Sequence, residues 1–328
     1  MRGVELSMLV DKVISKINSF DKILLMIHEN PDGDTLAAAS AIFQILEKLG
    51  KKPAMVCKDH VPRPFLFLKD MEKIRPDFLF GDFDVILVID CGDIRRTGFD
   101  ERLKNFAQKK KKILINIDHH PKNDLHKIAT LNLVDYKASS TSEIIWELLG
   151  QMGVEIDKNI ATALFTGLYT DTGGFKHSNT TPKTLQIAAE LMRKGARIKL
   201  VSKNVSLNRT VPAMKLWGVA LSRLRKHSIF KISSSVLTQK DLAECGATYE
   251  DIAGVVNLIN TIPDSKAAIL FYETPEKKIR ASIRTEDDKV DVSRLAQIFG
   301  GGGHKKASGF TINGRFQIHG TDWEIVFD

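Results

Sequence analysis

The sequence predicts a doubly wound α/β domain, built on a mainly parallel sheet and joined by a helical linker to a smaller α+β domain. Short apolar runs such as Lys22–Ile27 and Ile113–Ile117 barely alternate with polar residues, which is typical of strands buried on both faces of a parallel sheet. Segments with helical periodicity separate these runs, so strands and helices alternate along the chain. We expect residues 1–194 to form the first domain, 195–226 the linker and 227–328 the second domain.

The first domain should begin with an amphipathic helix over Met1–Asn18, whose apolar residues recur at helical spacing. The expected strands are Lys22–Ile27, Pro53–Cys57, Asp84–Asp90, Ile113–Ile117 and an edge strand, Leu131–Val134. The later helices should be Thr35–Leu49, Ser140–Leu149, Asn159–Thr170 and Thr181–Met192. Asp34 or Thr35 can cap the helix that they precede. The run Ser140-Thr141-Ser142-Glu143 resembles a capping box, and capping is a sufficient explanation for it.

Helices over Arg197–Asn208 and Pro212–Arg225 should lead into the second domain. Strand and turn signals then take over, interrupted by two helical patterns. The expected strands are Ser235–Thr238, Ala267–Tyr272 and Lys278–Ile283, and the expected helices lie near Tyr249–Ile259 and Val292–Phe299.

Composition is that of an ordinary soluble protein, with 43% of the 328 residues hydrophobic and 27% charged. No apolar segment reaches the length of a membrane span, and the N-terminal pattern lacks the core and cleavage site of a signal peptide. We therefore expect a cytoplasmic protein that does not contact a membrane. The net charge of +8 favours an anionic partner such as phosphate or nucleic acid.

The three cysteines, Cys57, Cys91 and Cys245, are widely spaced and odd in number. This pattern fits neither a disulfide framework nor a zinc site, so we expect reduced, structural thiols.

Acidic and histidine residues follow the ends of three predicted strands, where ligands bind in open α/β sheets. These residues are His28, Asp32 and Asp34 after the first strand, Asp90 after the third, and Asp118, His119 and His120 after the fourth. A lone Asp at a strand end usually caps it, and a single DHH tripeptide is a weak signal. The HxxxDxD spacing from His28 favours a divalent ion over capping, because capping needs only one acid.

Asp171 stands at the end of a predicted helix, before the paired glycines Gly173 and Gly174. A carboxylate is unfavourable at the negative end of a helix dipole unless a cation compensates it. The acids and histidines are together too many for one ion. Oxygen and imidazole ligands without thiolates favour Mn²⁺ or Mg²⁺, and two such ions form a hydrolytic site for phosphate esters.

The second domain carries a glycine run, Gly300–Gly303, followed by His304 and two lysines. Its amide groups can approach an anion closely, although a flexible hairpin loop also fits this composition. Arg280 and Arg284 lie four residues apart on a predicted strand and should face the same side.

In chain order, the motifs HENPDGD, VIDCGD, DHHP, TDTGGF and GGGHKKASG resemble those of the DHH phosphoesterase superfamily with its DHH-associated C-terminal domain. The resemblance covers most of the chain and is strongest to the branch of nanoRNases and pAp phosphatases. It implies hydrolysis of short RNA or DNA oligonucleotides, such as the linear dinucleotide pApA, to mononucleotides, and of pAp to AMP. A cyclic dinucleotide (c-di-AMP) phosphodiesterase and a non-catalytic nucleotide-binding protein are the alternatives. The branch also allows a homodimer.

The resemblance further implies two Mn²⁺ ions per chain, with Mg²⁺ or Co²⁺ as substitutes. The ligands would be His28, Asp32 and Asp90 for one ion, and Asp34, Asp90, His119 and Asp171 for the other. His120 would act on the scissile phosphate, and Asp118 would orient a neighbouring histidine. The far phosphate of the substrate would bind across a cleft between the domains to Arg280, Arg284, Gly301, Gly302, Gly303 and His304.

The sequence departs from the family pattern at two positions. His177 stands where an aromatic residue is frequent, and Ser308 stands where alanine is frequent. Both changes leave the expected metal ligands intact and bear on substrate preference. A manganese pyrophosphatase would lack the GGGH motif, and a long single-strand exonuclease would need further nucleic-acid-binding modules.

Overall fold

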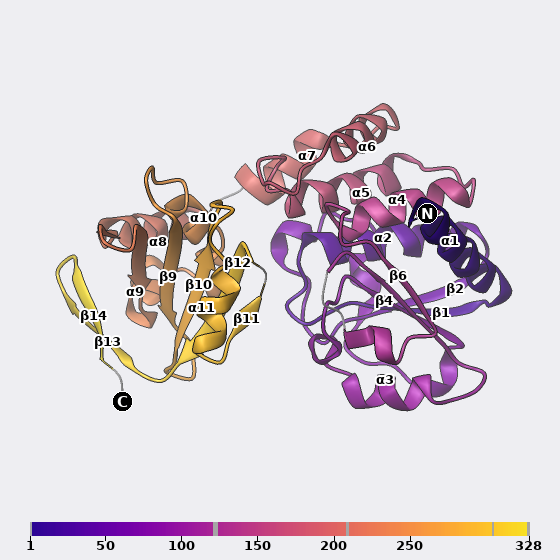
Figure 1. Cartoon of the computed structure of the whole chain (residues 1–328), viewed down its shortest axis with the longest axis horizontal. Coiled ribbons are helices and arrows are strands. Elements are labelled where there is room, and N and C mark those ends of the chain that lie inside the picture. The colour runs from indigo at the N-terminus through magenta and orange to yellow at the C-terminus, as the bar shows by residue number, and fades with distance from the viewer. Residues whose placement is uncertain (1, 121–123, 208–209, 304, 327–328) are drawn as a thin grey trace. The chain divides into compact units, whose positions relative to one another are not determined.

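The computed structural model describes residues 2–120, 124–207, 210–303 and 305–326 (Figure 1). The chain divides into two compact units, Met1–Asn208 and Arg209–Asp328. Among the described residues, no helix has both the length and the apolar character needed to cross a membrane.

The first unit is built on a six-stranded sheet with the order β3-β2-β1-β4-β5-β6. All neighbouring strands are parallel, which confirms the predicted fold class. The strands are β1 (Lys22–Met26), β2 (Lys52–Val56), β3 (Ile74–Arg75), β4 (Val85–Ile89), β5 (Ile113–Asp118) and β6 (Leu131–Val134). The helices are α1 (Arg2–Ser19), α2 (Gly33–Lys48), α3 (Asp100–Ala107), α4 (Thr141–Gln151), α5 (Lys158–Asp171), α6 (Pro182–Arg193) and α7 (Ile198–Ser202).

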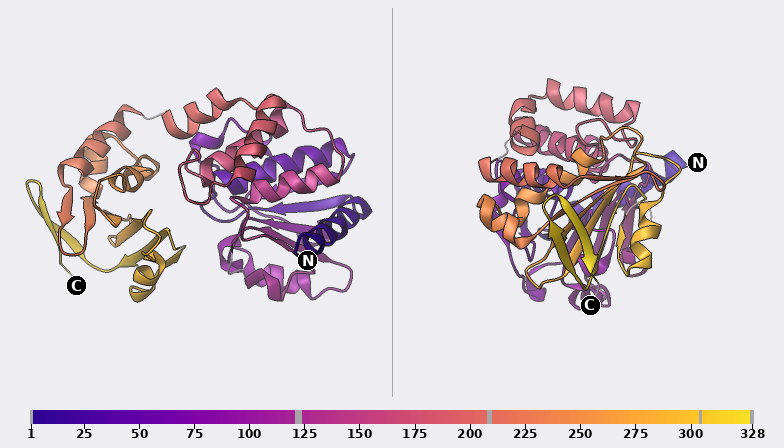
Figure 2. Two further views of the ribbon diagram at one scale, coloured as in Figure 1. Left: turned by 45° about the horizontal axis from the view of Figure 1, so that its top comes forward. Right: turned by 90° about the vertical axis from the view of Figure 1, so that its left-hand side faces the viewer.

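Helices cover both faces of this sheet, which explains why its strands are apolar throughout (Figure 2). In β1, Ile23 and Leu25 pack into a core with α1, α2, α4 and α5. Leu24 and Met26 point the other way, into a second core that includes Phe106 of α3.

The strand order reverses between β1 and β4, which are hydrogen-bonded neighbours in register from Ile23↔Val85 to Met26↔Val88. Crossovers from β1 and β4 therefore leave in opposite directions, and the loops after these two strands flank the crevice where ligands bind in doubly wound folds. These loops carry His28 and Asp90, so the topology places two of the expected ligands at one sheet edge.

The second unit contains a mixed six-stranded sheet with the order β11-β12-β10-β9-β8-β7, and a separate hairpin of β13 and β14. Its strands are β7 (Arg225–His227), β8 (Ile232–Leu237), β9 (Ala267–Glu273), β10 (Ile279–Arg284), β11 (Gly302–Gly303), β12 (Ala307–Ile312), β13 (Arg315–His319) and β14 (Asp322–Val326). Its helices are α8 (Val211–Ser222), α9 (Gln239–Cys245), α10 (Val255–Ile259) and α11 (Val292–Ile298).

The structure differs from the sequence expectations in several places, and it contains elements that were not predicted, among them α3, α9, β3, β7, β12, β13 and β14. The segment 195–226 is not a separate linker, because α7 buries Val201 in the core of the first unit and α8 buries Leu216 in that of the second. The expected helix near Tyr249–Ile259 breaks at Gly254, whose φ of 92° is incompatible with a helix. The end of the glycine run forms the edge strand β11 rather than a loop.

Candidate metal centre

The loop after β1 presents its acids through a helix cap. Oδ1 of Asp32 accepts hydrogen bonds from the amides of Asp34 (3.1 Å) and Thr35 (3.2 Å), so Asp32 is the N-cap of α2. The expectation that Asp34 or Thr35 caps this helix is wrong. The Thr35 hydroxyl instead donates to the carbonyl of Ile89 (3.1 Å) and ties α2 to the end of β4.

His28 is buried, and its ring is oriented by the backbone. Nδ1 lies 2.8 Å from the carbonyl oxygen of Glu29, which can only accept, so Nδ1 carries the proton and Nε2 offers a lone pair. Nε2 lies 3.7 Å from Oδ2 of Asp32. Ligand atoms of His28, Asp32 and Asp90 all lie within 4.8 Å of one another. Burial alone would raise the pKa of Asp32, but the hydrogen bond and charge of His28 lower it.

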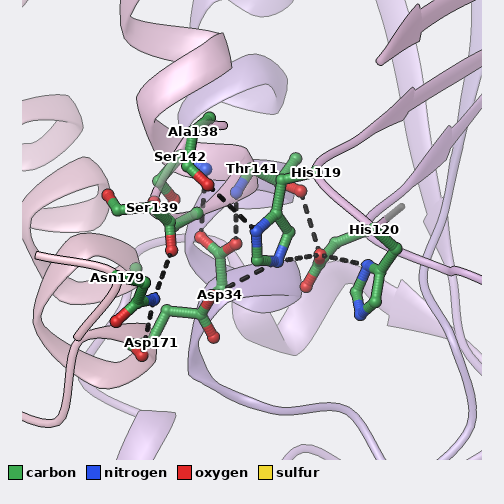
Figure 3. Close-up of polar contacts among 12 residues, drawn as sticks. Asp34, His119, His120, Ala138, Ser139, Thr141, Ser142, Asp171 and Asn179 are labelled. Carbon is green, nitrogen blue, oxygen red and sulfur yellow. Dashed lines mark hydrogen bonds and ion pairs between the residues drawn. The ribbon is translucent and has the colours of Figure 1, made fainter. Parts of the chain in front are cut away.

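A second group of ligand atoms within 4.8 Å of one another belongs to Asp34, His119 and Asp171. Figure 3 shows His119 with these two acids on one side and His120 on the other. Nδ1 of His119 lies 3.4 Å from the carbonyl of Ala138, which again leaves Nε2 as the ligand atom. Nε2 lies 3.2 Å from Oδ2 of Asp171.

Asp90 connects the two groups. Its Oδ1 lies 3.5 Å from Nε2 of His119 and 3.5 Å from Nδ1 of His120. Burial and the nearby charges of Asp34 and Asp32 raise the pKa of Asp90 well above its ordinary value. Its φ of 56° is left-handed, a conformation that costs non-glycine residues about 1–3 kcal/mol. The backbone conformation and the nearby negative charges are therefore both unfavourable for this carboxylate. A bound cation would offset that cost.

The N-terminus of α4 holds the acids in place. The amides of Thr141 and Ser142 donate to Oδ2 and Oδ1 of Asp34, at 2.6 and 3.0 Å. The Thr141 hydroxyl donates to Oδ1 of Asp90 at 2.9 Å. Burial raises the pKa of Asp34, and the hydrogen bonds from Ser142 act against this rise, as expected at a helix N-terminus.

Sequence reasoning assigned this segment to capping alone. Ser140 does cap α4, since its hydroxyl accepts from the amide of Glu143. Glu143, however, accepts from the amide and hydroxyl of Ser139 (3.2 and 2.7 Å). A helix cap needs only one hydroxyl group. The four consecutive hydroxyl residues, Ser139 to Ser142, were the signal in the sequence that this segment has a further role.

Thr141→Val, which keeps the side-chain shape and removes the hydroxyl, should weaken Mn²⁺ binding by roughly 10–100-fold, as lost orienting partners of metal ligands do. Thr141→Ser should restore it. Ser140→Ala is the matched control, because it removes the cap and should cost about 1 kcal/mol of stability while Mn²⁺ affinity stays unchanged. Calorimetric titration of the three variants with Mn²⁺ checks this, and equal losses in Ser140→Ala and Thr141→Val would make Thr141 a folding residue.

The carboxylate of Asp118 orients His120. Nδ1 of His120 lies 2.5 Å from Oδ1 of the fully buried Asp118, whose Oδ2 accepts from the amide of Gly92 at 2.8 Å. Burial opposes the ionisation of Asp118, but its hydrogen bonds to His120 and Gly92 keep its pKa below the ordinary value. The pair therefore fixes the proton on Nδ1 of His120. Gly92 must be glycine here, since its φ is 61° and a Cβ would lie 3.1 Å from the His120 ring.

Asn179 joins the segment after α5 to the α4 loop. Its side-chain amide donates to the carbonyls of Ser139 (3.0 Å) and Asp171 (3.3 Å), as Figure 3 shows. His177 contacts the same Asp171 carbonyl through Nδ1 at 3.3 Å. His177 thus lies beside the end of α5, next to a predicted ligand.

Two family models match the chain: the DHH family N-terminal domain over residues 22–168, and the DHHA1 domain over residues 233–318. The bifunctional oligoribonuclease and PAP phosphatase NrnA of Thermus thermophilus is 30% identical over 293 residues, which cover 89% of this chain and 84% of that protein. The chain belongs to the DHH family.

Other DHH proteins align over nearly the whole chain. The NrnA of Mycoplasma genitalium is 30% identical over 317 residues, with 94% of each chain covered. Among solved structures, an exopolyphosphatase-related protein from Bacteroides fragilis superposes with a TM-score of 0.86 at 25% identity, covering 94% of this chain and 92% of that one. The predicted resemblance to the DHH phosphoesterases is thereby confirmed.

The DHHA1 domain carries an open face with two arginines. Arg280, Ser282 and Arg284 alternate with the buried Ala281 and Ile283, which pack under α11. Paired residues on neighbouring strands share a face, so the arginines lie on the side that α8–α10 cover over β8 and β9. On β12 that side carries only Ala307, Gly309 and Thr311, and the apolar core beneath α8–α10 does not extend to it.

Arg284 is half-buried on this face, and burial lowers the pKa of its guanidinium. Its Nη1 donates to the carbonyl of Ile283 at 3.0 Å, and within the described ranges no carboxylate lies at ion-pair distance. Arg280 is exposed. We define the arginine face as Arg280, Ser282, Arg284, Ala307, Gly309 and Gly302, the last being paired with Gly309.

The glycine run has a packing reason as well as an expected binding role. A Cβ on Gly301 would lie 2.2 Å from the carbonyl oxygen of Gly309, and one on Gly303 would lie 2.6 Å from that of Ala307. A Cβ on Gly302 would meet no atom within 4 Å, so packing does not require glycine at this position of the edge strand. His304 lies outside the described residues.

Proposed function

We propose that this DHH protein hydrolyses short oligonucleotides to mononucleotides and pAp to AMP, using two divalent metal ions. The observation that carries the proposal is the pair of ligand groups connected by Asp90, which belongs to the first group and lies 3.5 Å from His119 of the second, in a chain 30% identical to NrnA proteins over most of its length. Two oxygen-rich sites sharing one carboxylate suit phosphoester hydrolysis.

The donor atoms fit Mn²⁺ better than a thiophilic metal. They are imidazole nitrogens and carboxylate oxygens, and the two nearest thiols are engaged elsewhere. Sγ of Cys57 donates to the carbonyl of His28 (3.2 Å), and Sγ of Cys91 donates to that of Asp93 (3.1 Å). Burial raises the pKa of Cys57 to about 11 and that of Cys91 further. Both thiols stay protonated at neutral pH and are poor ligands.

The ligands divide as the two groups suggest. His28, Asp32 and Asp90 would hold one ion, and Asp34, Asp90, His119 and Asp171 would hold the other. When bound, the ions would neutralise phosphate charge and activate a water molecule. The chain's own part is to hold these ligands through Thr141 and Ser142, and to supply a proton at Nε2 of His120 for the leaving oxygen.

The arginine face of the DHHA1 domain would bind a substrate phosphate that is not hydrolysed. A half-buried guanidinium without a carboxylate partner is a strong phosphate donor, because its planar fork matches phosphate oxygens. Gly302 leaves its strand edge open to the same anion.

Arg284→Gln should therefore reduce kcat/KM for a 5′-phosphorylated dinucleotide by about 10–150-fold, the equivalent of 1.5–3 kcal/mol for a lost charged hydrogen bond. Hydrolysis of a small activated phosphodiester that lacks this phosphate should change little. Arg294→Gln is the matched control, because Arg294 is exposed on α11 over the opposite face. Equal losses on both substrates would show that Arg284 supports the fold or the chemistry.

A substrate panel with Mn²⁺ tests the proposed function. Purified protein should release mononucleotides from pApA and AMP from pAp, and long single-stranded RNA should be a poor substrate. Rapid cleavage of c-di-AMP would instead assign the protein to cyclic dinucleotides. No hydrolysis of any of these in a fully metal-loaded protein would contradict the proposal.

A further inference from the structure

A guanidinium lies against the ring of His28. Arg96 belongs to the short 3₁₀ turn Ile94–Thr97, on the loop after β4. Its Nη2 lies 3.1 Å from Nδ1 and 3.3 Å from Nε2 of His28. The carbonyl of Arg96 accepts from the amide of Glu29 at 2.6 Å, so the two loops of the crevice meet here.

The charge of Arg96 helps to lower the pKa values of Asp32 and Asp93, but it forms no contact ion pair with either carboxylate. Within the described ranges, no carboxylate lies at ion-pair distance from it, although it is only half-exposed. The neighbouring cations differ in this respect. Arg95 binds Asp93 through Nε and Nη2, and Lys58 lies 3.7 Å from the carboxylate of Glu29.

The imidazole ring of His28 is a poor hydrogen-bond partner for a permanent cation. Nδ1 of His28 carries a proton toward the Glu29 carbonyl, and Nη2 lies almost equally far from both ring nitrogens, so the guanidinium sits over the ring and not along the in-plane lone pair of Nε2. That lone pair is the one expected to bind a metal ion. The positive charge of the guanidinium therefore lies close to the expected position of a cation and repels it.

We propose that Arg96 is a substrate ligand whose guanidinium binds a phosphate oxygen beside the metal centre and whose charge opposes the binding of the ion at His28. This inference rests on the proposed function, since it requires a phosphate-bearing substrate. Replacement of Arg96 should then have two effects of opposite sign. Removing the guanidinium weakens phosphate binding, and it leaves Mn²⁺ binding unchanged or makes it tighter.

The opposite signs separate this role from two simpler ones. A residue that supports the metal ligands would weaken Mn²⁺ binding when replaced. A residue that only holds the two loops together acts through its backbone carbonyl, which every substitution retains. Neither role predicts weaker phosphate binding with intact or improved Mn²⁺ binding.

The test compares Arg96→Gln with Arg95→Gln, the adjacent residue of the same turn. Calorimetry measures the affinity of the nucleotide-free protein for Mn²⁺, and then the affinity of the Mn²⁺-loaded protein for AMP. Arg96→Gln should weaken AMP binding by roughly tenfold or more, as loss of a charged hydrogen bond does, and should bind Mn²⁺ at least as tightly as the wild type. Arg95→Gln should match the wild type in both, and Arg96→Lys should recover part of the AMP affinity.

Equal AMP affinities in Arg96→Gln and Arg95→Gln would overturn the inference, as would loss of Mn²⁺ from Arg96→Gln. A wild type that binds AMP but hydrolyses no substrate would contradict the proposed function and leave this comparison decisive for Arg96. A wild type that does not bind AMP in the presence of Mn²⁺ would overturn both.

Discussion

Asp90→Asn should lower the rate of phosphoester hydrolysis by on the order of 10³-fold or more, because the proposed ions lose their shared ligand and several kcal/mol of charge stabilisation. Asparagine is the informative replacement, since it keeps the size of the side chain and tolerates the left-handed φ of this position. Asp84→Asn is the matched control. Asp84 precedes the same strand at its opposite end and pairs with Lys112 at 3.2 Å. Steady-state kinetics with Mn²⁺ should show the loss only in Asp90→Asn.

Asp90→Asn should have the opposite effect on the free energy of unfolding, which it should increase in the metal-free protein at neutral pH. A carboxyl group whose pKa is raised by folding contributes stability below its unfolded pKa of about 3.9, and this contribution is lost as pH rises through the folded pKa. The contribution of Asp90 to the stability of the metal-free protein should therefore fall as the pH increases above about 4, so Asp90→Asn should gain stability relative to the wild type over this range. Thermal unfolding of both metal-free proteins at low and neutral pH measures this. A higher Tm at neutral pH in the metal-free wild type than in Asp90→Asn would show that the neighbouring carboxylates do not destabilise ionised Asp90.

His120→Ala should reduce the rate by roughly 10²–10⁴-fold, as expected for a lost acid–base group, while Mn²⁺ content stays near that of the wild type. The reason is the hydrogen bond between Nδ1 and Asp118, which orients the ring of His120 for proton transfer at Nε2. Asp118→Asn should slow the same step, and the double variant should be little worse than His120→Ala, because the two residues act as a unit.

Metal analysis decides between this role and a direct ligand role. His120 also forms a group with Asp90 and His119 whose ligand atoms lie within 4.8 Å of one another. Loss of one ion per chain from His120→Ala would therefore assign His120 to the metal. An unchanged rate would remove it from the chemistry altogether.

Except for the two-residue edge strand β3, the strands of the first unit could be predicted, because burial on both faces of the sheet leaves a continuous apolar signature. The same physics placed Asp90 and His28 near one another, since carboxyl ends of neighbouring parallel strands share an edge. The edge strand β11 could not be predicted in this way. Gly302 and Gly303 carry no side chains to alternate, and their pairing depends on the distant Gly309 and Ser308.

The supporting residues of the site were hidden for a different reason. Thr141 lies in a segment whose local pattern is fully explained by a helix cap, and its contact with Asp90 joins positions 51 residues apart. Arg96 lies in a turn without periodicity, beside a second arginine that is exposed and ion-paired. Sequence alone does not distinguish the two arginines, because they differ in their surroundings: His28 lies beside Arg96.

The most direct test of the two-ion account is a titration of metal-stripped protein with Mn²⁺, in which hydrolysis of pApA is measured against the number of ions bound per chain. The account predicts negligible activity without metal and full activity only as the second equivalent binds. Full activity in the metal-free protein, or a plateau reached at one ion per chain, would contradict it.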